Sequence, residues 1–232
     1  NSSLEDKNDN RDTSSKFVEL RGINPDIKGW ISIENTKINN PVFQGEDNIF
    51  YLTHDMNRKR NKYGALFFDC SNRIERNYNS QNLIIHGHHM RDGNMLAHIT
   101  KYKDIDFYKE NPHITLDTIY RNGIYKIFAA FIIDVDEDDG YGFNYMISDF
   151  DTQADFLDFI DEVNLRSLIK TTVDVVDGDE LLTLSTCTYE ISGANLRFVL
   201  MARRIREGES KEVDTKGAIY NPEPLYPKIW YK

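Results

Sequence analysis

The chain has 232 residues and a mass of 27.1 kDa, and its hydrophobic fraction of 40% is sufficient for one sizeable core. The formal net charge of −10 argues against nucleic acid as a partner, because phosphate binding needs a clustered cationic surface. The two cysteines, Cys70 and Cys187, make no disulfide framework, and no stretch approaches the roughly 18 apolar residues of a membrane-spanning helix.

The N-terminal part of the chain is predicted to be a flexible, solvated stalk over residues 1–15. A short helix follows from Ser15 to Leu20, and Phe17, Val18 and Leu20 form its apolar face. The folded part of the chain is therefore expected to begin near residue 16.

Most of the remaining sequence is predicted to be β-structure. Short runs of β-branched and aromatic residues alternate with Gly, Pro, Asn and Ser clusters, which is the pattern of strands joined by turns. Pro41 is expected at an edge position of its strand, and Arg121–Gly123 are expected to form a turn. So many short strands favour a closed or nearly closed barrel. The eight predicted strands cover residues 30–33, 38–43, 64–69, 82–86, 113–116, 125–134, 180–187 and 196–205.

Helical spacing is clearest between Thr152 and Leu168, and we expect this helix to pack on the sheet. A helical turn is expected within residues 46–54, and Met95–Tyr102 also has apolar residues at helical spacing. Residues 206–232 form a C-terminal extension, in which the prolines of Asn221–Pro227 exclude regular structure. In the helix from Thr152 to Leu168 the apolar stripe consists of Phe156, Phe159, Ile160 and Val163.

Cys187 is the candidate nucleophile, because it ends the apolar run 181–187 and strand ends often carry functional groups. Only a few per cent of an ordinary thiol, with a pKa of about 8.5, is ionised at neutral pH, so a nearby imidazole is needed. His88 follows another apolar strand and can act as the acid/base. Arg197 lies on the returning strand, and its guanidinium suits a developing oxyanion. These three segments together indicate acyl transfer through a thioester.

Each of these residues also has a purely structural interpretation. A lone cysteine is most often a small buried hydrophobe, and this holds for Cys70 as well. Arg197 on an alternating strand has the alternative of a surface position, which we expect for Arg203 and Arg204. Gly87 is expected to permit an unusual backbone angle before His88 and to remove side-chain bulk beside its ring.

The histidines His86, His88 and His89 leave a metal site open as an alternative, because imidazole is the commonest metal ligand. The sequence has no HExxH motif and no obvious carboxylate partner for these histidines. We therefore expect neither a metal nor another cofactor.

Several motifs in the same order resemble those of a sortase, specifically a class B sortase. The resemblance runs from about residue 24 to residue 205, and its ordered motifs make it specific. The matching stretches are Asn24–Asp26 with Gly29–Ile31, Pro41–Gly45, Asp47–Leu52, Lys62–Gly64, Gly87–Met90 with Met95–Leu96, Thr183–Cys187 and Arg197.

The resemblance implies a mainly-β fold: an eight-stranded sortase-type barrel with N-terminal helices and a long helix between strands six and seven. Residues 16–205 would be the catalytic domain. The implied partners are the sorting-signal peptide of a surface protein and an amine of the peptidoglycan precursor, and a membrane only through an N-terminal anchor upstream of this sequence. The implied location is the extracytoplasmic face of the cell membrane.

The implied reaction is cleavage of an NPxT-type sorting signal after Thr, followed by transfer of the acyl group to the amine. Cys187 would attack the Thr carbonyl, and His88 would protonate the leaving nitrogen and later deprotonate the incoming amine. Arg197 would hold the oxyanion or orient the peptide. The residues implied to line the peptide groove are Asn48, Leu52, Tyr145, Met146 and Ser185.

Two positions depart from the family pattern. His86 stands where relatives often have Tyr, and Thr188 follows Cys187 where acidic residues are frequent. The extension 206–232 has no implied role. Two other functions stay open: a hydrolytic cysteine peptidase, and a non-catalytic surface domain in which Cys187 is merely buried.

Overall fold

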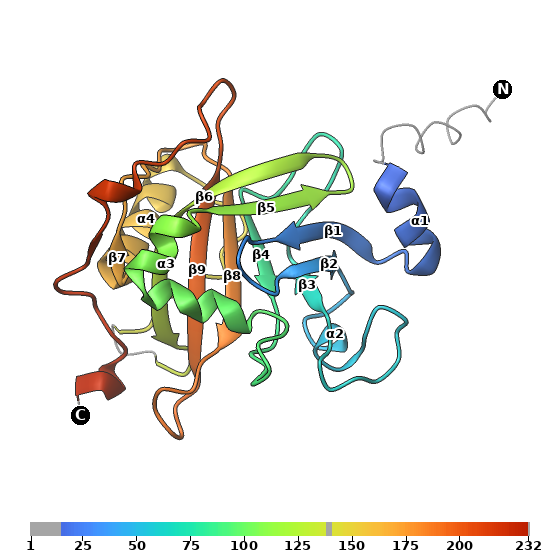
Figure 1. Ribbon diagram of the computed structural model, residues 1–232, viewed down its shortest axis with the longest axis horizontal. Coiled ribbons are helices and arrows are strands. Elements are labelled where there is room, and N and C mark those ends of the chain that lie inside the picture. The colour runs from blue at the N-terminus through green and yellow to red at the C-terminus, as the bar shows by residue number, and fades with distance from the viewer. Residues whose placement is uncertain (1–14, 138–140, 232) are drawn as a thin grey trace.

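The barrel predicted from the strand pattern is closed in the computed structural model, which describes residues 15–137 and 141–231 (Figure 1). The predicted stalk lies almost wholly outside the described residues. Around the barrel the strand order is β1-β2-β3-β4-β8-β9-β6-β5, so strands distant in sequence become neighbours. The barrel strands are β1 (Ile27–Ser32), β2 (Asn39–Phe43), β3 (Leu66–Phe68), β4 (Asn82–His86), β5 (His113–Thr118), β6 (Asn122–Asp134), β8 (Leu181–Cys187) and β9 (Leu196–Arg204).

Apolar residues pack against both faces of the barrel wall. Successive side chains of a strand point to opposite faces, so neighbouring residues join different apolar clusters. On β8, Leu182 and Leu184 belong to the largest apolar cluster. Leu181 belongs to a second cluster together with Val199 of β9 and residues of the helix α4. The strands therefore read as nearly continuous apolar runs rather than as alternating ones.

The helix α4 (Gln153–Arg166) lies between the sixth and seventh barrel strands and covers β6, as the sequence predicts. Thr152 caps it, since its side-chain oxygen accepts a hydrogen bond from the Asp155 N–H. The predicted stripe is buried, from Phe156 to Val163. Burial of an aromatic side chain of this size contributes about 1.5–3 kcal/mol, so this face fixes the helix to the barrel.

The smaller helices agree less closely with the predictions. The N-terminal helix α1 (Ser15–Ile23) is present and Phe17 is fully buried, but Val18 is half exposed and does not belong to the apolar face. The turn expected within 46–54 is α2 (Phe50–Thr53). The segment after Met95 forms the 3₁₀ helix η1 (Ala97–Lys103), and α3 (Ile105–Glu110) follows it without having been predicted.

Two turn and edge predictions need correction. β2 has a neighbour on each side and is not an edge strand. Its proline is tolerated because β3 pairs only with Val42 and Phe43, so Pro41 lies beyond the end of that pairing. The turn between β5 and β6 precedes its predicted place: the Thr118 N–H donates to the Arg121 carbonyl, and Gly123 already belongs to β6.

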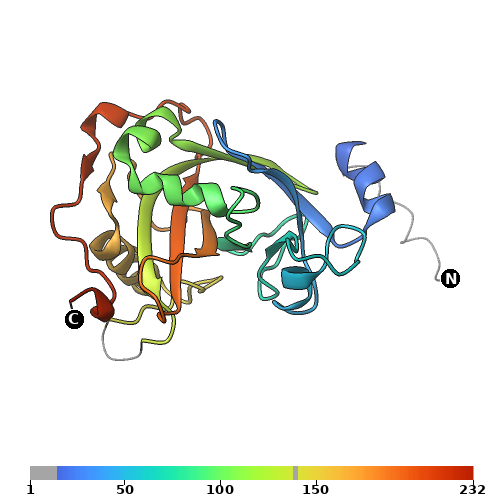
Figure 2. The ribbon, with the colours of Figure 1, turned by 60° about the horizontal axis from the view of Figure 1, so that its bottom comes forward.

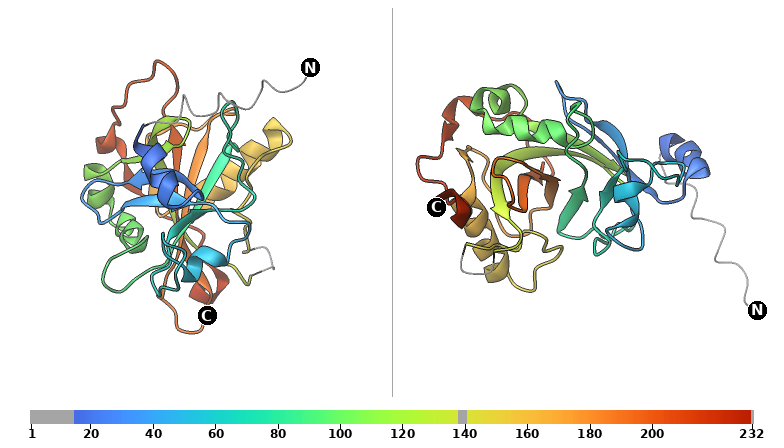
Figure 3. Two further views of the ribbon diagram at one scale, coloured as in Figure 1. Left: turned by 90° about the vertical axis from the view of Figure 1, so that its right-hand side faces the viewer. Right: turned by 90° about the horizontal axis from the view of Figure 1, so that it is seen from below.

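The C-terminal extension is built into the fold. Its short strand β10 (Ile219–Tyr220) pairs with β7 (Ile169–Lys170), and the 3₁₀ helices η2 (Thr215–Gly217) and η3 (Lys228–Tyr231) flank it. The Leu225 N–H donates to the Leu165 carbonyl of α4. The extension lies along the α4 side, at the far end of the molecule from α1 (Figure 2; Figure 3). None of the helices among the described residues is long and apolar enough to span a bilayer.

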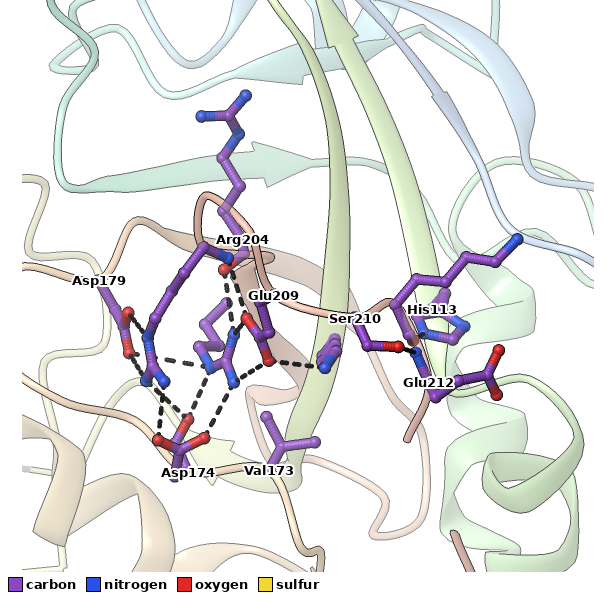
Figure 4. A network of polar contacts seen from close by, with 12 residues as sticks. His113, Val173, Asp174, Asp179, Arg204, Glu209, Ser210 and Glu212 are labelled. Carbon is purple, nitrogen blue, oxygen red and sulfur yellow. Dashed lines mark hydrogen bonds and ion pairs between the residues drawn. The ribbon is translucent and has the colours of Figure 1, made fainter. Parts of the chain in front are cut away.

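Arg203 of β9 is one of the largest fully buried side chains, with 1% exposure, so the prediction of a surface arginine is wrong for it. Its guanidinium donates to Asp174 and to both carboxylate oxygens of Glu209. Arg206 binds Asp174 and Asp179 beside it, and these acidic residues converge on one point in Figure 4. The first residues of the extension thus close one end of the β8–β9 pair with charges. Arg204, on the opposite face, is partly exposed as predicted.

Candidate active site

Cys187 and Arg197 lie directly opposite each other at the other end of the β8–β9 pair. Cys187 is the last residue of β8 and is half-buried, and Arg197 is the second residue of β9. The Thr188 N–H donates to the Leu196 carbonyl, which continues the antiparallel pairing one step past the strand. The loop of residues 188–195 therefore returns the guanidinium to the level of the thiol.

His88 reaches the same level because β4 runs parallel to β8, with His86 in register with Ser185. The Thr186 hydroxyl donates to the Gly87 carbonyl at 2.8 Å, and His89 Nδ1 lies 2.9 Å from the Cys187 carbonyl oxygen. These contacts tie the segment after β4 to the end of β8. The candidate thiol and imidazole thus lie on adjacent strand ends.

Gly87 is required by space and not by its backbone angle. It is not among the described residues with positive φ, so the expected unusual angle is absent. A Cβ at this position would approach Leu66 Cδ2 to 2.4 Å and Leu96 Cγ to 3.0 Å. The glycine lets the chain pass between these two leucines just before His88.

The imidazole of His88 is oriented by a backbone group. Its Nε2 lies 2.7 Å from the carbonyl oxygen of Leu52 in α2, and a carbonyl only accepts, so Nε2 carries a proton. Nδ1 is left without a hydrogen-bond partner among residues 15–137 and 141–231. In that same part of the chain the structure contains no hydrogen bond between His88 and the Cys187 thiol. Catalytic hydrogen bonds are often long in unliganded enzymes, so this arrangement is compatible with a Cys–His pair.

Arg197 keeps most of its donors free. One nitrogen, Nη1, donates to the Asn195 side chain at 2.7 Å and to the Leu196 carbonyl at 3.1 Å. Its Nε and Nη2 have no partner within the described part of the chain, and no carboxylate there pairs with it. A guanidinium offers five donors in a fixed fork, so this side chain is positioned and still able to bind an anion or a carbonyl oxygen.

Two of the implied groove residues meet each other. The Tyr145 hydroxyl lies 2.8 Å from the Ser185 hydroxyl, and both side chains are buried. Burial raises the pKa of Tyr145, and Cys187 acts in the same direction, whereas the charge of Arg197 opposes it. These electrostatic effects mean that Tyr145 lies near both candidate groups. Met146 next to it is 44% exposed and offers apolar surface to a ligand.

Asn48 lies at the other side of β4, in a polar chain with a carboxylate. Its amide nitrogen donates to Asp69 at 2.8 Å, and its amide oxygen accepts from the Cys70 N–H. The same carboxylate binds His86 at 2.9 Å. No carboxylate partner of the histidines is evident from the sequence, and in the structure Asp69 takes this place beside His86.

Asp69 and Asn195 are the residues that sequence reasoning missed. Asp69 follows two phenylalanines at the end of an apolar strand, and Asn195 stands in a polar loop, so neither position carries a distinguishing pattern. Leu52 is predicted to line the groove, and its carbonyl oxygen also holds the ring of His88. Backbone contacts of this kind leave no trace in a sequence.

The remaining predictions concern the other cysteine, Thr188 and metals. Cys70 is exposed, so the expectation of a buried hydrophobe is wrong for it. Thr188 is buried and donates to the Glu190 carboxylate, which also pairs with Lys103. Among residues 15–137 and 141–231, no three His, Cys, Asp or Glu side chains are grouped to hold a metal ion.

Comparisons with known proteins agree with this architecture. The Sortase domain family model matches residues 31–205. Sortase B of Staphylococcus aureus is 34% identical over 191 residues, covering 82% of this chain and 75% of that protein. Sortase B of Listeria monocytogenes is 31% identical over 198 residues, covering 85% and 77% respectively.

Solved structures show the same likeness. The Staphylococcus aureus sortase B-substrate complex superposes with a TM-score of 0.76 at 32% identity, over 84% of this chain and 87% of that one. Sortase B of Clostridium perfringens gives a TM-score of 0.74 at 31% identity, over 82% of this chain and 100% of that one. The overall fold is thus shared with these sortase B structures. The chain belongs to the sortase family and is a class B sortase, an enzyme of the cysteine transpeptidase type.

Proposed function

We propose that this enzyme cleaves an NPxT-type sorting signal after Thr and transfers the acyl group, through a thioester on Cys187, to an amine of the cell-wall precursor. The observation that carries the proposal is that the chain segments bearing Cys187, Arg197 and His88 meet at one end of the barrel. Cys187 and Arg197 are register partners, and His89 beside His88 binds the Cys187 carbonyl. The resemblance to class B sortases supplies the substrate motif.

The first half-reaction forms the thioester. The Cys187 thiolate attacks the Thr carbonyl carbon, and Arg197 stabilises the negative charge on the carbonyl oxygen with its unpaired donors. The C–N bond then breaks, and the leaving nitrogen takes a proton from His88. Because Leu52 holds Nε2, the nitrogen that exchanges this proton is Nδ1.

The second half-reaction releases the acyl group. The incoming amine attacks the thioester carbonyl and transfers its proton to His88 Nδ1, and the C–S bond breaks to restore the thiolate. A cavity of about 650 Å³ next to His89 leaves room for the amine. It is lined by Lys62, Tyr63, His89, Met90, Arg91, Asp92 and Tyr189.

In this proposal the peptide binds along the C-terminal ends of β4 and β8. Ser185 and Tyr145 form one part of its floor, and Met146 supplies an exposed apolar side chain beside them. Asn48 and the Leu52 segment form the part nearer α2. The proposed site of action is the outer face of the cell membrane, with the enzyme anchored upstream of this sequence.

The proposal is tested by mass spectrometry of the protein incubated with a library of Asn-Pro-x-Thr peptides, with and without a triglycine amine. We expect a mass increase on Cys187 equal to the acyl fragment ending in Thr, and an aminolysis product when the amine is added. Cys187→Ala and His88→Ala are expected to abolish both, while Cys70→Ala, the matched control, is expected to keep them. An adduct on Cys70, or full turnover by Cys187→Ala, would contradict the assignment.

The same experiment separates the two other functions. A hydrolytic cysteine peptidase yields only the free acid even at high amine concentration. A non-catalytic binding domain yields no adduct, and its Cys187 resists a small alkylating reagent at neutral pH. Partition of the thioester toward the amine product is the result expected for a transpeptidase.

A further inference from the structure

Asp69 is a buried carboxylate whose hydrogen-bonding capacity is fully used. One oxygen accepts from the backbone N–H and the hydroxyl of Ser71, and the other accepts from Asn48 and His86. Burial opposes ionisation of this group, but the hydrogen bonds from His86 and Ser71 prevail and hold the pKa of Asp69 well below its ordinary value. Asp69 is therefore ionised at neutral pH and has no lone pair to offer a substrate.

His86 is fixed by this carboxylate on one side and is open on the other. Its Nε2 lies 2.9 Å from Asp69, and its side chain is 16% exposed. Its ring also contacts Phe67, with 5.4 Å between the ring centroids. Throughout residues 15–137 and 141–231 no group hydrogen-bonds Nδ1. Nδ1 is not one of the fully buried polar atoms that lack a partner in this part of the chain, so a ligand can reach it.

The position of His86 lies on the proposed peptide path. It is in register with Ser185, which is two residues before Cys187 on the parallel strand. Two residues of a strand span about 6–7 Å, and two residues of an extended peptide span the same distance. A peptide running along these strand ends therefore passes His86 two to three residues from the bond that Cys187 attacks.

We propose that His86 is a specificity-determining residue of the peptide groove, oriented by Asp69 through Nε2 and hydrogen-bonded through Nδ1 to a polar group of the bound peptide. The inference rests on the proposed function. The Asp69 carboxylate only accepts hydrogen bonds, so Nε2 is the donor in this pair and Nδ1 is the ring nitrogen left for the peptide. Asp69 acts as a positioning residue, because it contacts His86 and not the peptide.

Two isosteric substitutions separate the two nitrogens of the ring. His86→Gln places an amide near the position of Nε2 and keeps the contact with Asp69, but it has no polar atom at the position of Nδ1. His86→Asn keeps a polar atom near Nδ1 and loses the contact with Asp69. The recognition role predicts that His86→Gln raises KM for an Asn-Pro-x-Thr peptide about five- to tenfold with kcat within twofold, while His86→Asn raises KM less.

A merely structural role of His86 predicts the reverse order. His86→Gln would then behave as wild type in KM and in thermal unfolding, and His86→Asn would lower the unfolding temperature. That outcome overturns the inference. The failure of the inference is distinguishable from that of the proposed function, because a wild-type KM in His86→Gln leaves the Cys187 adduct intact. Absence of any Cys187 adduct in the wild-type protein would overturn both.

Asp69→Asn provides the second arm of the test. It replaces one acceptor oxygen with an amide donor that faces Asn48 and His86, so His86 loses its orientation. We expect its KM to rise as in His86→Asn, and the double variant with His86→Gln to show little rise beyond that of His86→Gln alone, because both changes weaken the same interaction of Nδ1 with the peptide. Independent, multiplicative effects on KM would contradict the positioning role of Asp69.

Discussion

The two ends of the β8–β9 pair carry two arginines in opposite situations. Arg203 and Arg197 lie on the same strand, six residues apart, and therefore on the same face of it. Arg203 is buried and bound by Asp174 and Glu209, whereas within the described ranges Arg197 binds only the Asn195 amide oxygen and the Leu196 carbonyl oxygen. At one end of the strand pair the arginine is paired with carboxylates of the protein itself. At the other end the arginine keeps free donors that can bind a ligand.

The difference shows what a site requires of a charged residue. A guanidinium saturated by carboxylates stabilises the fold but has nothing left for a ligand. A guanidinium fixed through one nitrogen keeps its charge and direction at a small cost in conformational freedom. Arg203 is therefore expected to control stability and Arg197 to control activity, and each can be tested against the other.

Removal of Arg203 is expected to have the largest effect on stability. In Arg203→Ala the buried end of the barrel loses its central cation, and we expect the free energy of unfolding to fall by about 3–5 kcal/mol, measured by urea denaturation. The turnover of the folded fraction should stay unchanged. Arg204→Ala is the matched control, because its ion pair with Glu180 is partly exposed and such pairs contribute about 1 kcal/mol or less. Equal losses in the two variants would contradict the structural role of Arg203.

Removal of Arg197 is expected to have the largest effect on activity. In Arg197→Ala the value of kcat/KM for peptide cleavage should fall by about 10²–10³, which is typical for loss of an oxyanion donor. Arg197→Lys should recover little, since an ammonium lacks the planar fork of donors. The urea midpoint of both variants should match that of the wild type. A fall in stability as large as that of Arg203→Ala would show that Arg197 serves the fold.

As the pH falls, we expect the ion pairs around Arg203 to lose their contribution to stability before the barrel strands unfold. Hydrogen bonds from Arg203 lower the pKa of Glu209, and hydrogen bonds from Arg206 do the same for Asp174. A carboxylate with a depressed folded-state pKa contributes stability that is present above its unfolded pKa and is lost as the pH falls through the folded value.

Glu209→Gln tests this pH dependence. At pH 7 it should lower the free energy of unfolding by about 1–2 kcal/mol, because a charge-assisted hydrogen bond is replaced by a neutral one. The difference from wild type should shrink from about pH 4.5 downward, where the unfolded carboxylate becomes protonated. Urea titrations at pH 7, 5 and 3 measure it, and a difference that stays constant would rule out Glu209 as the acid-sensitive group.

The smallest expected effect concerns Asn195, the side chain that holds Arg197. In Asn195→Ala one nitrogen of the guanidinium loses an acceptor at 2.7 Å but keeps the Leu196 carbonyl. We expect kcat/KM to fall only about two- to fivefold, with no change in the urea midpoint. A fall as large as that of Arg197→Ala would mean that Asn195 itself acts on the substrate.

The sequence alone was sufficient for the repetitive parts of the fold. The strands that end at His86 and Cys187 and the helix with Phe156 and Val163 follow from patterns within ten to fifteen neighbouring residues, and such patterns are visible without the rest of the chain. The ordered motifs also identified the family. Where the prediction failed, the local signal was weak: Val18 stands on a helix with little apolar character, and Arg203 looks like any polar residue of an alternating strand.

Only the tertiary structure decided how the parts of the site meet. The pairing of Cys187 with Arg197 depends on strand register, and the contact of His88 with Leu52 joins residues 36 apart. The Asp69–His86 pair depends on β3 and β4 being neighbours in the barrel. Contacts of this kind depend on which segments become neighbours after folding. The sequence therefore determined which reactive side chains are present, and the barrel determined which of them lie close enough to act together.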